Sequence, residues 1–296
     1  LLAHGCPVQA IVAAFGFDER IVADWWARSG RQGQAVQEAL VERPRDLRQV
    51  QADESRVKKQ GGIVWMALAM MVKTRLWLGG EVSEQRDLPL IRRLIERVRR
   101  CAAHRPLLLC TDGLCSYIRA MRETFRDPVR TGTGGRPRLR PWRNVLIAQV
   151  VKRYERRRVV ATDRRIIDGT PARVETLRRR SQGGGVINTA YIERLNATFR
   201  ERLAPLARRS RALARQTLTL HEGMFLVGTV DNFCTPHESL GHAQKTTPAM
   251  AAGITDHCWP MQEFLSFHVP LPRWVPPKQR GRPSRALQRL IKRWCA

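Results

Sequence analysis

The chain has 296 residues, of which 53 are lysine or arginine and 26 are aspartate or glutamate, so its formal net charge is +27. A hydrophobic share of 43% is enough for a buried core and excludes a disordered tail, while the charge argues against an enzyme of small metabolites. Nucleic acid is the partner that this charge favours, because each neutralised phosphate releases counterions. An anionic membrane surface is the weaker alternative.

The longest apolar run, Ile63–Val72, is too short to span a bilayer, and the chain carries no signal-peptide pattern. Its seven cysteines include no CxxC pair, which indicates reduced thiols that mostly pack. We therefore expect a cytoplasmic, nucleoid-associated protein with no membrane partner. Since the first residue is Leu rather than Met, we also expect a truncated N-terminus.

Residues 1–31 predict a helix-turn-helix-like DNA-binding domain. Apolar side chains recur there at helical spacing, Gly16 breaks the run, and Asp18 can cap a second helix. Two short helices of this kind also occur in ordinary bundles, but on a chain this basic we favour a DNA-reading module. The side chains available to phosphates or base edges are Arg20, Arg28 and Arg31. Residues 32–48 predict a linker helix.

From Gln49 the apolar residues follow the period of strands, and a mixed α/β sheet is expected. The elements predicted there are a strand that ends at Asp53, strands over Ile63–Val72 and Arg75–Val82, an amphipathic helix over Asp87–Ala103 and a buried strand over Leu107–Thr111. The order of three strands, a helix and a strand is typical of the start of an α/β sheet with mixed strand directions.

The second half alternates basic breaks with regular elements. The predicted features are a Gly, Pro and Arg-rich break over Arg126–Arg143, an inserted strand pair over Val145–Val151 and Arg157–Ile167, a loop over Arg178–Gly185 that stays mobile until DNA binds, and helices over Ile187–Leu203 and from Arg211 to about Phe233. Residues 256–296 predict a basic Pro and Arg-rich tail that ends in a short helix over Arg285–Trp294.

Three carboxylates fall where a strand end or a helix face presents them. Asp53 closes an alternating strand, Asp112 closes an apolar one, and Glu193 lies in an amphipathic helix. Taken singly, each is typical of a turn residue or a surface ion pair. Taken together they form a cage for hard divalent cations, which on a basic chain indicates metal-assisted chemistry on nucleic-acid phosphodiesters.

The segment Tyr191-Ile192-Glu193-Arg194-Leu195-Asn196, continued to Leu203, resembles the DDE transposases of bacterial insertion sequences. Ala52-Asp53-Glu54 and Thr111-Asp112-Gly113 occur in the order and context in which that family places its first two acids. The segments over 206–211 and 231–240 are also similar, so the resemblance covers about residues 48 to 255.

This resemblance implies an RNase H-like fold over residues 49–255, a mixed five-stranded sheet flanked by helices, with an insertion at about 126–180. It implies two Mg²⁺ or Mn²⁺ ions held by Asp53, Asp112 and Glu193, and a protein that cuts the ends of a DNA element and joins the freed 3′-OH to target DNA. It also implies a homo-oligomer that acts on paired element ends.

Glu201 is the alternative to Glu193 as the third metal-binding acid. Glu201 lies two turns after Glu193 on the same helix, and the separation of Asp112 from Glu193 is longer than in compact integrase-like versions of the fold. Asn196 and Arg200 share a helix face with Glu193, where they are expected to hold a ligand carboxylate or touch the scissile phosphate. Glu54 is expected to point away from Asp53 because successive residues of a strand alternate.

Further DNA contacts are expected from basic side chains outside the acids. Two Gly-Arg-Pro pieces, at 135–138 and 280–283, resemble AT-hooks, whose arginines lie in a narrow minor groove; the alternative is a basic proline-rich linker. The residues expected to contact DNA in these regions are Arg178, Arg179, Arg180, Arg194, Arg280 and Arg282.

Two other functions remain open. An RNase H-like nuclease would cut without joining, and an inactive transposase-derived protein would bind DNA and leave it uncut.

Overall fold

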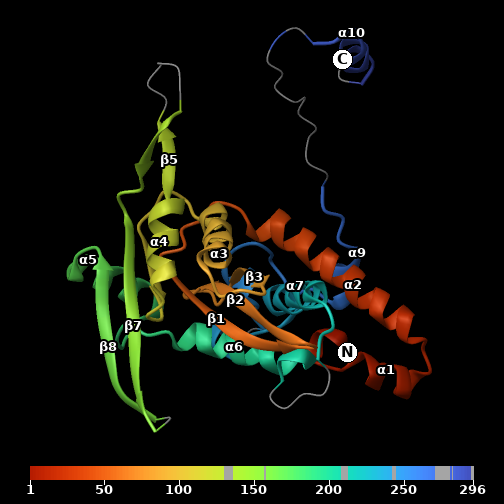
Figure 1. The fold of residues 1–296 in the computed structure, drawn as a ribbon, viewed down its shortest axis with the longest axis horizontal. Coiled ribbons are helices and arrows are strands. Elements are labelled where there is room, and N and C mark those ends of the chain that lie inside the picture. Colours follow the sequence, from red (N-terminus) through yellow and green to blue (C-terminus); the bar gives the residue numbers. More distant parts are fainter. Residues whose placement is uncertain are drawn as a thin grey trace.

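Six strands form the central sheet (Figure 1): β1 (Gln49–Lys59), β2 (Gly62–Met71), β3 (Trp77–Ser83), β4 (Leu107–Thr111), β7 (Val145–Glu155) and β8 (Arg158–Asp168). Their order is β3-β2-β1-β4-β7-β8. β1, β2 and β3 form an antiparallel meander, β4 and β7 run parallel to β1, and β8 returns antiparallel beside β7. The computed structural model describes residues 1–129, 136–156, 158–207, 213–241, 245–270, 281 and 283–294.

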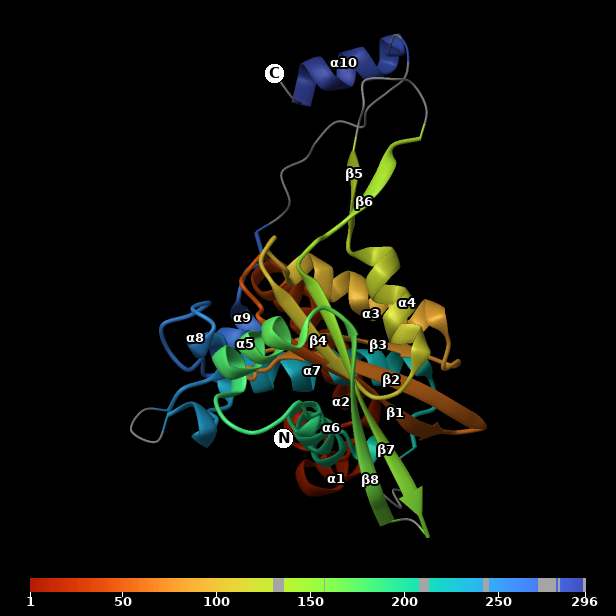
Figure 2. The ribbon, with the colours of Figure 1, turned by 90° about the vertical axis from the view of Figure 1, so that its left-hand side faces the viewer.

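Helices cover both faces of this sheet (Figures 1 and 2). On β3, a Cβ at Gly79 would meet Arg97 of α3 (Leu88–Cys101), whereas a Cβ at Gly80 would meet Met224 of α7 (Thr217–Cys234). Since neighbouring residues of a strand face opposite sides, α3 and α7 lie on opposite faces. α4 (Cys115–Thr124) packs beside α3, and α6 (Ala190–Arg202) lies on the side of α7. The predicted mixed α/β sheet flanked by helices is confirmed.

The helix α3 shows why the sequence pattern succeeds in this region. Its apolar residues from Leu90 to Cys101 recur at helical spacing and are buried, while its arginines point outward or into ion pairs. Asp87 caps the helix by accepting a hydrogen bond of 3.0 Å from the Leu90 amide. Burial of a side chain such as Leu90 contributes about 1.5–3 kcal/mol.

The N-terminal helices pack on the sheet domain through α7. They are α1 (Val8–Phe15) and α2 (Glu19–Val36), separated by Gly16 and capped by Asp18, as predicted. At Gly30 and Gly33 of α2 an added Cβ would lie 2.6 and 2.7 Å from backbone oxygens of α7, so these glycines allow the two helices to touch. The helix predicted over residues 32–48 is present only to Val41 and is not separate. It continues α2 through Val36 and a π-helical turn, because the buried face of α2 continues along α7.

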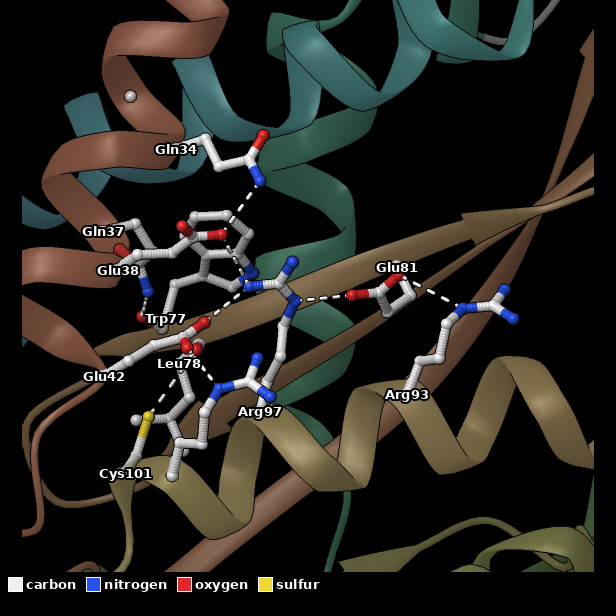
Figure 3. A network of polar contacts seen from close by, with 12 residues as sticks. Gln34, Gln37, Glu38, Glu42, Trp77, Leu78, Glu81, Arg93, Arg97 and Cys101 are labelled. Atoms are coloured by element: carbon white, nitrogen blue, oxygen red, sulfur yellow. Dashed lines mark hydrogen bonds and ion pairs between the residues drawn. The ribbon is translucent and has the colours of Figure 1, made fainter. Parts of the chain in front are cut away.

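The buried Arg97 links α3 to the segment that follows α2 through ion pairs (Figure 3). Arg97 is 7% exposed, and its guanidinium donates to the carboxylates of Glu81 on β3 and Glu42. Arg93 pairs with Glu81 and Arg100 with Glu42, so both acids are held by two arginines. Because a buried charge is costly unless it is paired, these contacts fix the end of α2 relative to the sheet.

Several elements of the second half differ from the sequence expectation. α4 was not predicted, and the Gly, Pro and Arg-rich break contains a paired ribbon of β5 (Arg126–Val129) and β6 (Arg138–Pro141). α5 (Pro171–Gln182) covers most of the predicted loop over 178–185, which is therefore wrong up to Gln182. The helix extends that far because Arg178 pairs with Glu175 one turn back and donates to the carbonyls of Gly183 and Gly184.

The C-terminal part consists of short helices. α8 (Pro248–Ala251) and α9 (Met261–Ser266) follow α7, and α10 (Arg285–Trp294) has the bounds predicted for the tail helix. Arg280 and Arg282 of the second Gly-Arg-Pro piece, like Gly135 of the first, lie outside the described residues. Within the described ranges, no helix is both long and apolar enough to cross a membrane.

Candidate metal centre

Asp53 and Asp112 meet because their strands are neighbours in a parallel register. β1 pairs with β4 through Gln49 opposite Leu108 and Gln51 opposite Cys110. The same register carried two residues further brings Asp53 beside Asp112, one residue past the end of β4, and neighbouring strands are about 4.8 Å apart. Gly113 follows in close contact with β7, where an added Cβ would lie 3.2 Å from Val151. Asp53 and Asp112 are therefore together, but the strand end predicted at Asp53 is wrong. β1 continues past Asp53 to Lys59, because it stays paired with β2 over its whole length.

Glu54 joins these acids, contrary to expectation. Oxygens of Asp53, Glu54 and Asp112 lie within 4.8 Å of one another. The Glu54 side chain is 1% exposed; it accepts 2.8 Å from Arg86 Nε and 2.9 Å from the Tyr117 hydroxyl. Arg86 also lies 3.6 Å from Asp112. Glu54 and Asp53 alternate along β1, but Arg86 and Tyr117 hold the Glu54 carboxylate near the point where β4 ends, close to both aspartates.

The electrostatics of Asp53 follow from this crowding. Burial, and then the negative charges of Glu54 and Asp112, raise the pKa of Asp53 from its ordinary 3.8 to about 6. Its two oxygens accept hydrogen bonds from the Glu54 amide at 2.9 Å and from Asn196 Nδ2 at 2.8 Å. A group of carboxylates that repel one another so strongly is a place where a cation is stabilised.

Glu193 reaches the same site from α6. The buried Gln51 positions this helix: its Nε2 donates 2.7 Å to the Asn188 carbonyl, and its Oε1 accepts 3.0 Å from the Ile192 amide. The Glu193 carboxylate accepts from Lys152 of β7 and, at 2.6 Å, from Thr189. Burial raises the pKa of Glu193, but these hydrogen bonds outweigh it and hold the pKa below its usual value.

Asn196 and Arg200 lie on the same face of α6, as predicted. Asn196 is 1% exposed; its amide nitrogen holds Asp53, and its oxygen has no partner among the described residues. Arg200 donates 3.1 Å to Ser55 on β1. The rival acid Glu201 is exposed on the helix surface and does not line the pocket that contains Glu193.

Asp53, Asp112 and Glu193 line a pocket of about 640 Å³ beside the middle of β1 and just past the end of β4. Its walls come from β1, the residues that follow β4, β7 and α6, and therefore from segments far apart in the chain. The lining residues are Asp53, Asp112, Gly113, Val150, Val151, Lys152, Tyr154, Thr189, Glu193 and Arg200.

The arginines predicted to contact DNA have different environments. Arg20, Arg180 and Arg194 are exposed. Arg28 pairs with Asp24 at 3.6 Å, Arg31 with Glu222 at 3.2 Å, and Arg179 with Glu175 at 2.6 Å, each with most of its side chain in solvent. Arg178 is 4% exposed and bound to Glu175, so the structure argues against it as a DNA contact. Arg280 and Arg282 lie outside the described part of the chain.

The sequence reasoning missed several residues that shape the pocket. Gln49, Gln51, Asp53 and Ser55 alternate as polar residues along the buried strand β1, and this period-two signal was available in the sequence. Arg86, Tyr117 and Lys152 carried no comparable local signal, because only the folded sheet brings them to the acids.

The donor set consists of carboxylate oxygens, which suit hard cations such as Mg²⁺ or Mn²⁺ rather than zinc. The acids whose oxygens lie within 4.8 Å of one another are Asp53, Glu54 and Asp112, and both Glu54 oxygens accept hydrogen bonds from Arg86 and Tyr117. Glu193 lines the same pocket as Asp53 and Asp112. Neither a scan against models of protein families nor a search among curated proteins gave a match for this chain.

Proposed function

We propose that this protein is a DDE transposase that cuts DNA at element ends and joins the freed 3′-OH to target DNA. The observation that carries the proposal is the convergence of Asp53, Asp112 and Glu193 on one pocket from two parallel strands and a helix. The mixed sheet flanked by helices supports an RNase H-like core, in which β8 is an additional strand. The resemblance of the Glu193 segment to this class is an independent argument.

Asp53, Asp112 and Glu193 would hold two Mg²⁺ or Mn²⁺ ions. Such ions, when bound, activate the attacking hydroxyl and stabilise the leaving oxygen of an in-line displacement at phosphorus. The protein's own part is to orient these acids: Asn196 holds Asp53, and the Gln51 contacts hold the start of α6. Lys152 and Arg200 line the pocket as cations that suit the phosphate of a DNA strand.

The proposed partner is double-stranded DNA, at element ends and at the target. The net charge of +27 supports this, as do exposed arginines on α2 and α6, among them Arg20, Arg28 and Arg194. We include in the proposal a helix-turn-helix-like role for α1 and α2, a homo-oligomer that pairs two ends, and a place with the nucleoid in the cytoplasm. These parts of the proposal rest on the sequence and on its resemblance to DDE transposases.

The test is nicking and strand joining on a supercoiled plasmid with Mn²⁺ or Mg²⁺. We expect joined products with the wild type and none with Asp112→Asn, which should still bind DNA because its basic surface is intact. Asp163→Asn is a matched control, since that exposed acid on β8 pairs only with Arg165 among the described residues and does not line the pocket.

Each outcome separates the competing functions. Nicking without joining, on DNA that carries the element ends, would favour a nuclease. Tight binding without any cut strand would favour an inactive DNA-binding descendant. Cleavage that survives in Asp112→Asn would reject the assignment of the acids.

A further inference from the structure

The β7–β8 hairpin extends past the acids as an arm (Figures 1 and 2). β7 pairs with β4 only from Val145 to Gln149, and from there the two strands of the hairpin continue paired with each other alone. Gln149 lies opposite Thr111, the residue before Asp112. Tyr154 is five residues further along β7, which places its backbone about 16 Å beyond the end of β4.

The β7 strand of this arm lines the pocket that contains the acids, through Val150, Val151, Lys152 and Tyr154. Residues of both parities take part, and the pairing of β7 with β8 shifts register between Arg153 and Tyr154. Lys152 donates to Glu193, so this part of β7 lies against α6. Tyr154 lies beyond Lys152 and is 60% exposed, so its ring forms an open wall at the mouth of the pocket.

The surroundings of Tyr154 limit what its ring can bind. The pocket is lined by acids and cations, which does not suit an apolar ligand or a partner helix. The arm itself is basic, with acids only at Glu155 and Asp163 between residues 152 and 165. An exposed aromatic ring set among cations beside a phosphodiester site is the arrangement that binds a nucleobase by stacking. The basic residues of the described arm are Lys152, Arg153, Arg156, Arg158, Arg164 and Arg165.

We propose that Tyr154 is a stacking platform for an unpaired base of the DNA strand whose phosphate lies at Asp53 and Asp112. The identity of the strand as DNA rests on the proposed function. The base lies within about five nucleotides of the scissile phosphate, because 16 Å corresponds to about five base steps. Lys152 contacts the intervening backbone. Tyr154 thus makes the site prefer a frayed or single-stranded end over a fully paired one.

The experiment measures binding in EDTA, so that metal chemistry takes no part. The probe is a fluorescent duplex with a five-nucleotide single-stranded end, compared with the same duplex whose five end positions are abasic. Stacking of one base changes affinity by about 5- to 150-fold, so we expect the wild type to prefer the base-bearing probe by about tenfold. Tyr154→Phe should keep this preference, whereas Tyr154→Ala should bind the two probes with about equal affinity.

The control variant is Val160→Ala, which shortens another exposed side chain of the arm outside the pocket and should leave the preference unchanged. Equal losses on both probes in Tyr154→Ala, or a preference that survives in that variant, would overturn the inference. The joining assay decides the proposed function separately: joining without a base preference would reject only the stacking platform, and a base preference without joining would reject only the transposase.

Discussion

Replacing Asp53 by asparagine should stabilise the fold at neutral pH. The pKa of Asp53 is raised from 3.8 to about 6, so above pH 6 the folded protein holds a carboxylate that the unfolded chain ionises more easily. Between these two values the native state binds more protons than the unfolded state, and the free energy of unfolding falls as the pH rises. Below pH 3.8 both states are protonated at this group, and it has no effect.

The size of the effect follows from the pKa difference of about two units. At about 1.4 kcal/mol per unit, ionised Asp53 costs about 3 kcal/mol above pH 7. Asparagine removes this charge but gives up the hydrogen bond from Asn196 to a charged oxygen, which is worth about 2 kcal/mol. The bond from the Glu54 amide can be kept by the asparagine oxygen. We therefore expect a net gain of about 1 kcal/mol in Asp53→Asn.

Urea denaturation in EDTA at pH 8, 6 and 4 measures this gain directly. The difference between Asp53→Asn and the wild type should be largest at pH 8 and should shrink steadily towards pH 4. Adding Mn²⁺ at pH 8 should stabilise the wild type, by about 2.7 kcal/mol at a hundred times the dissociation constant, and should leave the variant nearly unchanged. An Asp53→Asn protein that is less stable at pH 8, or equally affected at every pH, would refute the crowding of acids at this site.

Two further substitutions test other parts of the structure. Glu193→Gln should reduce strand cleavage on the order of 100-fold or more in the plasmid assay, because it removes a carboxylate that lines the pocket. Glu201→Gln, on the exposed surface of α6, should cleave within about twofold of the wild type. A large loss in Glu201→Gln with little loss in Glu193→Gln would make Glu201 the third acid. Gly33→Ala should lower the free energy of unfolding by about 1–2 kcal/mol, because the new Cβ would lie 2.7 Å from the Phe225 carbonyl. Gly184→Ala is the control, since its new Cβ would meet nothing within 4 Å. Equal melting temperatures of the two variants would argue against close packing of α2 on α7.

The elements with a strong local period were predictable from sequence. The strand over Leu107–Thr111 and the helix over Arg285–Trp294 have the predicted bounds, because a short continuous apolar run favours a buried strand and helical spacing of apolar residues favours a helix. The same reasoning failed in two places. α2 runs through the predicted linker because of a tertiary contact, its packing along α7. α5 covers a basic stretch because of a local one, the pair of Arg178 with Glu175 one turn back.

Some features of the candidate site were likewise predictable from sequence, and others depended on the tertiary structure. The amino-acid sequence by itself determined the order of Asp53, Asp112 and Glu193 and the two strands and the helix that carry them, since these depend on residues close in the chain. Only the tertiary structure decided that Glu54 is drawn to the acids by Arg86 and Tyr117, and that Lys152 and Tyr154 face them from the hairpin arm. Those contacts depend on the register of β1, β4 and β7, which is set by hydrogen bonds and packing between segments that are distant in sequence.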